Sequence, residues 1–109
     1  VHDGLWDVYN NQHMGMCGEA CAEKYGFTRE DQDQWAIQSY ERARAAWDQG
    51  KFDTEVIPVE VPARRGKTET VAKDEEYLRA DLTKLPDMRP AFKKEGGTVT
   101  AANASPLND

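Results

Sequence analysis

Apolar side chains recur at helical spacing early in the chain. Between residues 14 and 25, the apolar positions roughly keep helical spacing: Cys17, Ala20, Cys21 and Tyr25. Gly26 follows directly, and glycine readily adopts the left-handed conformation that caps a helix at its C-terminus. The pattern predicts a short helix over residues 14–25.

A stronger helical pattern begins after Thr28, a good N-cap residue, and ends at Gly50. Its first turn holds Glu30, Asp31 and Asp33, where the helix dipole favours negative charge. The apolar positions form one face: Ala36, Tyr40, Ala43 and Trp47, with Ile37 beside them. The opposite face is predicted to be solvated: Gln38, Glu41, Arg42 and Asp48.

Alternation of apolar and polar residues predicts a strand over residues 55–61. Ile57, Val59 and Val61 would share one side of it. Pro58 has no N–H to donate to a sheet, so this strand is expected at an edge.

The other segments carry weaker patterns. Residues 64–67 (RRGK) read as a basic turn and residues 68–71 as a second short strand, so we expect a β-hairpin. Residues 74–95 are polar and interrupted by prolines, which predicts a loop with at most a turn or two of helix. Small residues fill positions 96–105 and let the backbone approach its neighbours closely. Residues 1–13 are mixed, with a turn-prone Asn-Asn pair.

Length and charge narrow the functional classes. A chain of 109 residues suits one small domain, and 39% hydrophobic with 31% charged residues predicts a modest core and a large solvated surface. The net charge of -6 disfavours nucleic-acid binding, which usually requires a basic excess, and general attraction to anionic membranes. No apolar run reaches membrane-spanning length.

The two cysteines, Cys17 and Cys21, fall on one predicted helix, where disulfide geometry is awkward. We therefore expect reduced thiols and an intracellular protein. A zinc site needs three or four ligands, and His2 and His13 are too far apart to complete one convincingly. A His13–Cys17 nucleophile is possible chemistry, but Cys17 is not at a helix N-terminus, so small thiols buried in the core are expected instead.

Basic residues gather in the second half of the chain. Two interpretations stay open: solvated surface charge, or a local clamp for a phosphate-bearing ligand. Gly96-Gly97 has no helix signal after it, so it is not a phosphate-binding loop of the strand–glycine–helix type. The basic positions are Arg64, Arg65, Lys67, Arg79, Lys84, Arg89, Lys93 and Lys94.

Strings in the order found in the thiolase family resemble that family and cover nearly the whole chain. Residues 96–109 (GGTVTAANASPLND) are similar to its GTVTA-(G/A)-NAS-x-x-NDGAA segment. Residues 13–22 resemble its HMG–AEN–A stretch, and residues 29–36 resemble its R-(D/E)-(E/D)-Q-D-x-(F/Y/W)-A helix start. Residues 52–59 resemble its F-x-x-E-I-(V/I)-P-V strand, and two strings within 74–92 (DEE and RPAF) match in order.

The resemblance implies an α+β segment of a larger thiolase-fold enzyme, whose two similar halves form αβαβα layers. This chain would be an internal piece. Residues 1–97 would be the CoA-binding loop domain, mostly helical with a short β-hairpin. Residues 98–109 would lead into a core strand.

The resemblance also implies an activity. The parent would be an acetyl-CoA C-acetyltransferase, an acyltransferase that condenses two acetyl-CoA into acetoacetyl-CoA and CoA, or runs the thiolytic reverse. The family's C-S-G, N-E-A-F, G-H-P and C-x-G-G motifs are absent, so no catalytic residue is expected here. A non-catalytic CoA-binding module and an oligomer-assembly piece are the alternatives. A homotetramer, formed with the rest of the chain and located in mitochondria or cytoplasm, is expected.

Binding roles carry over residue by residue. Ser105 would contact the pantetheine arm of CoA. The adenine and phosphate end would meet Arg79, Ala80, Asp81 and Lys84. The pantetheine and acyl channel would be lined by His13, Met14 and Phe92, and Tyr40 would touch this region.

The resemblance also implies a potassium site, but only by similarity to one subgroup of the family. In the potassium-activated thiolases, backbone oxygens near Ala101, Ala102 and Ala104 help to hold the ion, with Tyr40 close by. The TAAN form of residues 100–103 is similar to the eukaryotic acetoacetyl-CoA thiolases, and an all-oxygen site suits a hard cation. Plainer interpretations are that Tyr40 is a core residue and that Arg79 and Lys84 are ordinary surface.

Overall fold

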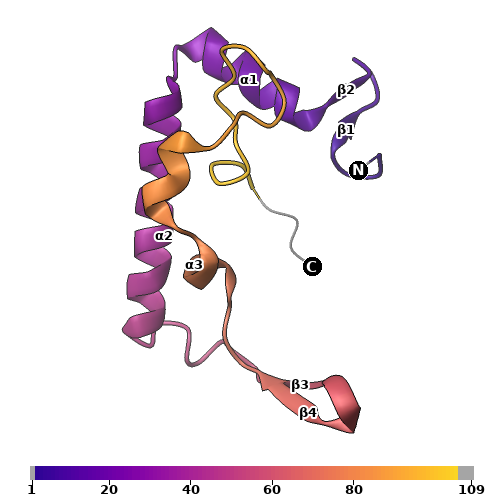
Figure 1. The fold of residues 1–109 in the computed structure, drawn as a ribbon, viewed down its shortest axis with the longest axis vertical. Helices are drawn as coiled ribbons and strands as arrows, with labels where there is room; N and C mark the ends of the chain where they lie inside the picture. The colour runs from indigo at the N-terminus through magenta and orange to yellow at the C-terminus, as the bar shows by residue number, and fades with distance from the viewer. Residues whose placement is uncertain (1, 106–109) are drawn as a thin grey trace. The chain divides into compact units, whose positions relative to one another are not determined.

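The computed structural model describes residues 2–105, which form two compact units. Of the described residues, 2–38 and 81–105 belong to the first unit and 39–80 to the second. Each unit is described below by itself, and Figure 1 shows the order of the elements along the chain.

The first unit opens with a very short hairpin. Strands β1 (Trp6–Asp7) and β2 (Gln12–His13) pair antiparallel. The Asp7 carboxylate stabilises the turn by accepting the backbone N–H of Asn10 at 3.2 Å, and Asn11 takes the left-handed conformation with φ 52°. The Asn-Asn pair indicated this turn, but the strands beside it were not predicted.

Helix α1 (Met14–Tyr25) has the predicted bounds. At its start, the Nδ1 atom of His13 accepts the N–H of Gly15 at 3.1 Å. At its end, Gly26 is left-handed with φ 71°, and its N–H donates to the carbonyl of Ala22. The predicted glycine cap is therefore confirmed.

The cysteines of α1 differ from the expectation of buried thiols. Both are free, but Cys17 is only half-buried and Cys21 is exposed. The face of α1 that turns inward carries Glu19 and Ala22 instead. The helix was predicted correctly, but its inward face was assigned to the wrong residues, because Ala20, Cys21 and Tyr25 are exposed.

Helix α2 (Arg29–Asp48) runs from the first unit into the second. Thr28 caps it as predicted: its hydroxyl accepts the N–H of Asp31 at 3.1 Å, and the Asp31 carboxylate accepts the N–H of Thr28 at 2.9 Å. The Thr28 hydroxyl also donates to the Asp31 carboxylate at 2.7 Å, and this bond, together with the one from the Thr28 N–H, lowers the pKa of Asp31. Ala36 is buried, whereas Trp35 beside it is exposed. The predicted solvated face is confirmed, because each of its members is exposed: Gln38, Glu41, Arg42 and Asp48.

Aromatic stacking forms the core of the second unit. Trp47, near the end of α2, lies parallel to the buried ring of Tyr77, with ring centroids 6.0 Å apart. Phe52 packs on the same indole at 5.3 Å. Gly50, with φ 66°, reverses the chain between them.

An arginine fastens the short helix α3 (Glu76–Arg79) to α2. The guanidinium of Arg44 donates to the carbonyl of Tyr77 at 3.0 Å and to that of Ala80 at 2.7 Å. Helix C-termini leave carbonyl groups without partners, and a cation satisfies them well. Tyr77 belongs to α3 and Ala80 follows its last residue, so Arg44 binds the carbonyl end of this helix.

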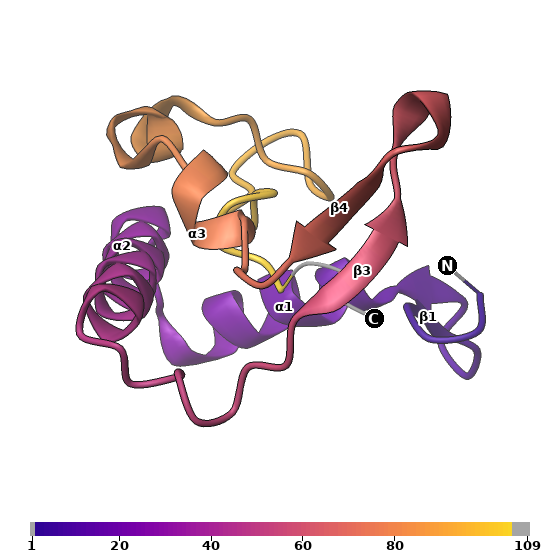
Figure 2. The same cartoon turned by 90° about the horizontal axis from the view of Figure 1, so that it is seen from below.

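Strands β3 (Val59–Pro62) and β4 (Thr68–Val71) form the predicted hairpin, with Val59 opposite Val71 (Figure 2). The predicted strand over residues 55–61 begins too early, because residues 55–58 belong to no strand. Pro58 cannot donate a ladder hydrogen bond, which explains the late start. The basic turn is confirmed: the 3-10 helix η1 (Arg64–Gly66) connects the strands.

The last part of the first unit is mostly irregular. It contains the 3-10 helix η2 (Leu82–Asp87) and a turn within residues 98–105. Leu85, Val99 and Thr100 are buried here. The expectation of a loop with short helices over residues 74–95 is confirmed by α3 and η2.

Helices together with two small antiparallel sheets confirm an α+β chain. Residues 98–105 contain no strand, and residues 106–109 of the predicted core strand lie outside the described part. The predicted division at residue 97 stays a prediction. Within residues 2–105, no helix is both long enough and apolar enough to cross a membrane.

Candidate functional site

A buried carboxylate fixes the start of the small-residue segment. Glu19 of α1 is 6% exposed. The N–H of Thr98 donates to both of its oxygens and the N–H of Val99 to one, each at 2.9 Å, and the Thr98 hydroxyl donates to the other. Burial alone would raise the pKa of Glu19, but the hydrogen bonds from Val99 and Thr98, with the charge of Lys93, outweigh it and lower the pKa. The group is therefore a carboxylate that holds the backbone of residues 98 and 99.

The turn that follows is closed by its own side chains. Asn103 accepts the N–H of Thr100 at 2.7 Å through Oδ1 and donates to the carbonyl of Thr98 at 2.9 Å through Nδ2. The hydroxyl of Thr100 accepts the N–H groups of Ala102 and Asn103 at 3.3 Å, and the N–H of Ala104 donates to the Thr100 carbonyl at 3.0 Å. The backbone leading to Ser105 is thus fixed by a dense local network.

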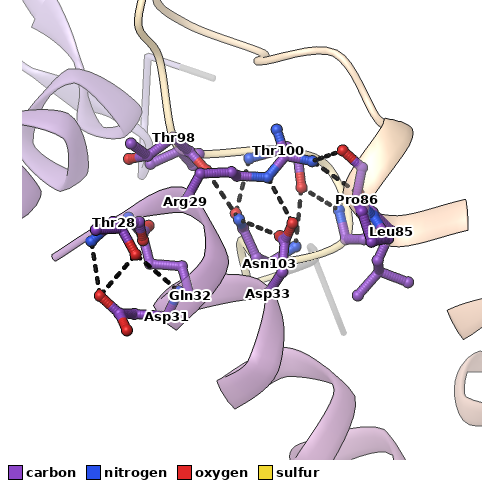
Figure 3. A network of polar contacts seen from close by, with 12 residues as sticks. Thr28, Arg29, Asp31, Gln32, Asp33, Leu85, Pro86, Thr98, Thr100 and Asn103 are labelled. Atoms are coloured by element: carbon purple, nitrogen blue, oxygen red, sulfur yellow. Dashed lines mark hydrogen bonds and ion pairs between the residues drawn. The ribbon is translucent and has the colours of Figure 1, made fainter.

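A second buried carboxylate joins this turn to η2 (Figure 3). Asp33 of α2 is 4% exposed. Its Oδ1 accepts from Asn103 Nδ2 at 3.0 Å, and its Oδ2 pairs with Arg29 Nε at 2.7 Å. The Nη2 atom of Arg29 donates to the carbonyls of Leu85 at 2.7 Å and Pro86 at 3.3 Å. Arg29 and Asp33 of α2 therefore connect η2 with this turn, and both of these segments are far from α2 in sequence.

The residues expected to line the acyl channel lie together. The rings of His13 and Phe92 have centroids 4.6 Å apart, and Met14 follows His13 with an exposed side chain. The N–H of Ala91 donates to the carbonyl of Val99 at 2.9 Å, which ties this aromatic pair to the segment that Glu19 holds.

Lys84 and Asp81 are accessible and paired. Asp81 accepts from the N–H of Thr83 at 3.2 Å and from its hydroxyl at 2.7 Å, and so caps η2. Hydrogen bonds from Thr83 and then from Lys84 lower the pKa of Asp81 to about 2. Lys84 Nζ lies 2.9 Å from Asp81, but its side chain is 77% exposed and can reach another anion.

The remaining predicted contacts belong to the second unit. Arg79 forms an ion pair with Glu75 and is largely exposed. The carbonyl of Ala80 is occupied by Arg44. Tyr40 is half-buried on α2; burial, together with the charge of Glu76, raises its pKa.

Ser105 is exposed and belongs to the first unit, with Lys84. Arg79, Ala80 and Tyr40 belong to the second. The convergence of all these residues on one ligand stays a prediction.

Sequence reasoning missed the residues that hold the site together. Asp33 was assigned to the helix dipole, but it is buried and bonds Arg29 and Asn103. Glu19 falls within a string that resembles the family, but no structural role is predicted for it. The helical pattern of residues 14–25 gives no signal either, because it places Cys17, Ala20 and Cys21 on the inward face, whereas the structure buries Glu19.

The profile of the thiolase N-terminal domain matches residues 1–109. The mitochondrial acetyl-CoA acetyltransferase of Homo sapiens is 54% identical over 109 residues, which are 100% of this chain and 26% of that protein. Its mitochondrial counterpart from Aspergillus fumigatus is 53% identical over 110 residues, 100% of this chain and 25% of that protein.

Solved structures of a thiolase and of an acetyl-CoA acetyltransferase also match this chain. A thiolase from Ascaris suum in complex with coenzyme A superposes with a TM-score of 0.88 at 46% identity, covering 100% of this chain and 27% of that one. The acetyl-CoA acetyltransferase of Bacillus anthracis gives a TM-score of 0.87 at 42% identity, covering 96% and 26%. The chain spans about a quarter of the length of the curated relatives it matches.

Proposed function

Because this chain belongs to the thiolase family, we propose that the complete protein is an acetyl-CoA C-acetyltransferase and that this segment binds CoA over the active site. The reaction is the condensation of two acetyl-CoA into acetoacetyl-CoA and CoA, or its thiolytic reverse. The observation that carries the proposal is the match of the whole chain to proteins with that name. The family motifs named above that would supply the chemistry are absent from residues 1–109, so the rest of the protein would have to provide them.

The segment contributes binding and positioning. CoA carries phosphate groups at one end and a thiol on a long pantetheine arm at the other. Lys84 and Arg79 are exposed cations that suit the phosphates. His13, Met14 and Phe92 offer an apolar wall for the arm, and Ser105 offers a hydroxyl at the end of the fixed turn.

A potassium ion fits the same turn. No described residue donates a hydrogen bond to the carbonyl oxygens of Ala101, Ala102 and Ala104. Neutral oxygen ligands suit a hard cation. The ion, held by these carbonyls, would add positive charge and rigidity beside Ser105, and Tyr40 is the further residue that the family places near it.

An assembly role is the second candidate. Tyr25, Phe27 and Trp35 are exposed and line a hollow of about 700 Å³ in the first unit. Exposed aromatic side chains in one place are typical of surfaces that another part of a protein covers. The rest of the chain, or a neighbouring subunit of a homotetramer, would supply that cover. An intracellular location, mitochondrial or cytoplasmic, completes the proposal.

Titration calorimetry with CoA on the complete protein tests the binding role. Replacing both Arg79 and Lys84 by alanine removes two cations and leaves Glu75 and Asp81 unpaired, which repel phosphate. At about 1 kcal/mol for each exposed contact, the Kd for CoA should rise about 30-fold.

The control is Arg42→Ala with Lys51→Ala, which removes the same charge from exposed positions outside the proposed site. It should change the Kd less than twofold. Equal effects of the two double variants would show that only net charge matters. An unchanged Kd in the Arg79 and Lys84 variant would leave assembly as the better explanation.

A further inference from the structure

We infer that Arg29, Asp33 and Asn103 are positioning residues that hold η2, which carries Lys84, and the turn that leads to Ser105 at a fixed mutual distance. The inference rests on the proposed CoA binding, because it concerns the spacing of two segments that would contact the two ends of that ligand.

The connection is continuous from η2 through Arg29, Asp33 and Asn103 to the turn. One oxygen of Asp33 accepts a hydrogen bond from Arg29 Nε at 2.7 Å, and the other accepts one from Asn103 Nδ2 at 3.0 Å. Arg29 also donates to the carbonyl of Leu85, the residue after Lys84, at 2.7 Å. Asn103 also accepts the N–H of Thr100, within the turn, at 2.7 Å. Figure 3 shows the carboxylate of Asp33 between the two segments.

Neither segment has a sheet ladder to hold it in place. Residues 82–87 form a 3-10 helix, and residues 98–105 contain a turn without strand pairing. Their mutual position therefore depends on side chains. Leu85 supplies apolar burial, which is tolerant of small shifts, whereas hydrogen bonds of fixed length and direction are not.

Stability alone is a weak reason for this arrangement. A buried ion pair loses in desolvation much of what it gains in attraction, and apolar replacements of the same volume are often as stable. A carboxylate that accepts from an arginine on one oxygen and from an amide on the other does provide one defined geometry. A protein that must keep two ligand contacts in register needs that geometry.

The spacing matters because CoA is long. A single ligand that contacts both segments gains full affinity only when each contact is reached without strain, and a preorganised site avoids the cost of ordering the segments on binding. Loosening the link should therefore weaken CoA binding although no proposed CoA contact is altered.

The test uses the complete protein and the variant Asp33→Asn. Asparagine keeps the shape but offers one acceptor, so it can serve Arg29 or Asn103 but not both. We expect the KM for CoA in the thiolytic direction, and the calorimetric Kd, to rise about 10-fold, with kcat within about twofold of wild type. The matched control is Glu30→Gln, which removes the same charge from an exposed position on the same helix, and its KM and Kd should not change.

A second variant covers the case in which Asp33→Asn does not fold. Arg29→Lys keeps a cation for Asp33 but lacks the fork that also reaches Leu85. It should raise the KM for CoA about threefold or more, measured well below its melting temperature.

Coupling to Lys84 separates positioning from general weakening. In a double-mutant cycle, the effect of Asp33→Asn on the Kd should shrink at least twofold when Lys84 is already alanine, because a displaced Lys84 then no longer matters. A lowered melting temperature with KM and Kd unchanged, or effects that are fully additive with Lys84→Ala, would overturn the inference. Wild-type protein that fails to bind CoA would instead overturn the proposed function.

Discussion

Replacing Glu19 by glutamine should release residues 98 and 99 from α1. The carboxylate is buried and accepts donors that all come from one place: the N–H and hydroxyl of Thr98 and the N–H of Val99, each at 2.9 Å. Glutamine has nearly the same shape, but one of its two terminal atoms is an NH2 group that cannot accept. At least one of these donors then loses an acceptor, and the remaining bonds lose the charge.

The free-energy cost of the substitution follows from the number of hydrogen-bond donors that lose the carboxylate. A hydrogen bond to a charged group contributes about 1.5 to 3 kcal/mol and a neutral one about 1 kcal/mol. Three donors weakened in this way would cost about 2 to 4 kcal/mol. Glutamine avoids the desolvation of a buried charge, so we expect the lower value, about 2 kcal/mol, which is about 30-fold in the local opening equilibrium.

Hydrogen exchange measures this opening directly. In the complete protein, peptides that cover residues 97–104 should lose about 30-fold in protection in the Glu19→Gln variant. Glu23→Gln serves as the control, because Glu23 lies one turn later on α1 and is exposed. Its protection should stay within twofold of wild type.

Two results would refute this reasoning. Unchanged exchange over residues 97–104 would mean that the carboxylate does not hold the segment. An equal loss of protection throughout α1 would mean that the substitution weakens the whole unit, and not the specific bonds to Thr98 and Val99.

Two further predictions concern the same segment. Because the folded pKa of Glu19 is lowered from 4.5, its stabilisation is complete above the unfolded pKa and is lost as the pH falls through the folded value. Protection over residues 97–104 in the wild-type protein should therefore fall as the pH is lowered below 4.5. A wild-type profile as flat as that of Glu19→Gln would contradict this. Gly97→Ala would place a methyl group against the backbone carbonyl of Lys93 and should lower the free energy of unfolding by about 1 to 3 kcal/mol. In Gly96→Ala the methyl group meets open space, so only the strain of φ 66° remains, which should cost about 1 kcal/mol. Urea unfolding should therefore rank Gly97→Ala as the more destabilising change, and the opposite order would be inconsistent with the structure.

Local elements could be predicted well because their causes are local. The bounds of α1 follow from helical spacing and the left-handed cap at Gly26, and the start of α2 follows from Thr28 and Asp31. The hairpin of β3 and β4 follows from alternation around a basic turn. The family resemblance needed no structure either, since it rests on ordered strings of residues.

The roles of buried polar residues could not be predicted in this way. Asp33 has the type and position of a helix-dipole residue, and sequence spacing cannot show that Asn103 bonds to it across 70 positions. Glu19 likewise meets Val99 across 80 positions. Cys21 has the hydrophobicity of a core residue, but no partner segment covers its side of α1 among residues 2–105.

Residue patterns alone indicate the two long helices, the hairpin of β3 and β4, the caps and the family, because neighbouring residues govern backbone conformation and recurring strings mark common descent. Which carboxylates are buried, and which backbone groups they hold, becomes known only from the folded chain. Burial and hydrogen-bond partners depend on segments that meet only after the chain has folded, and a short window of sequence contains no record of that meeting.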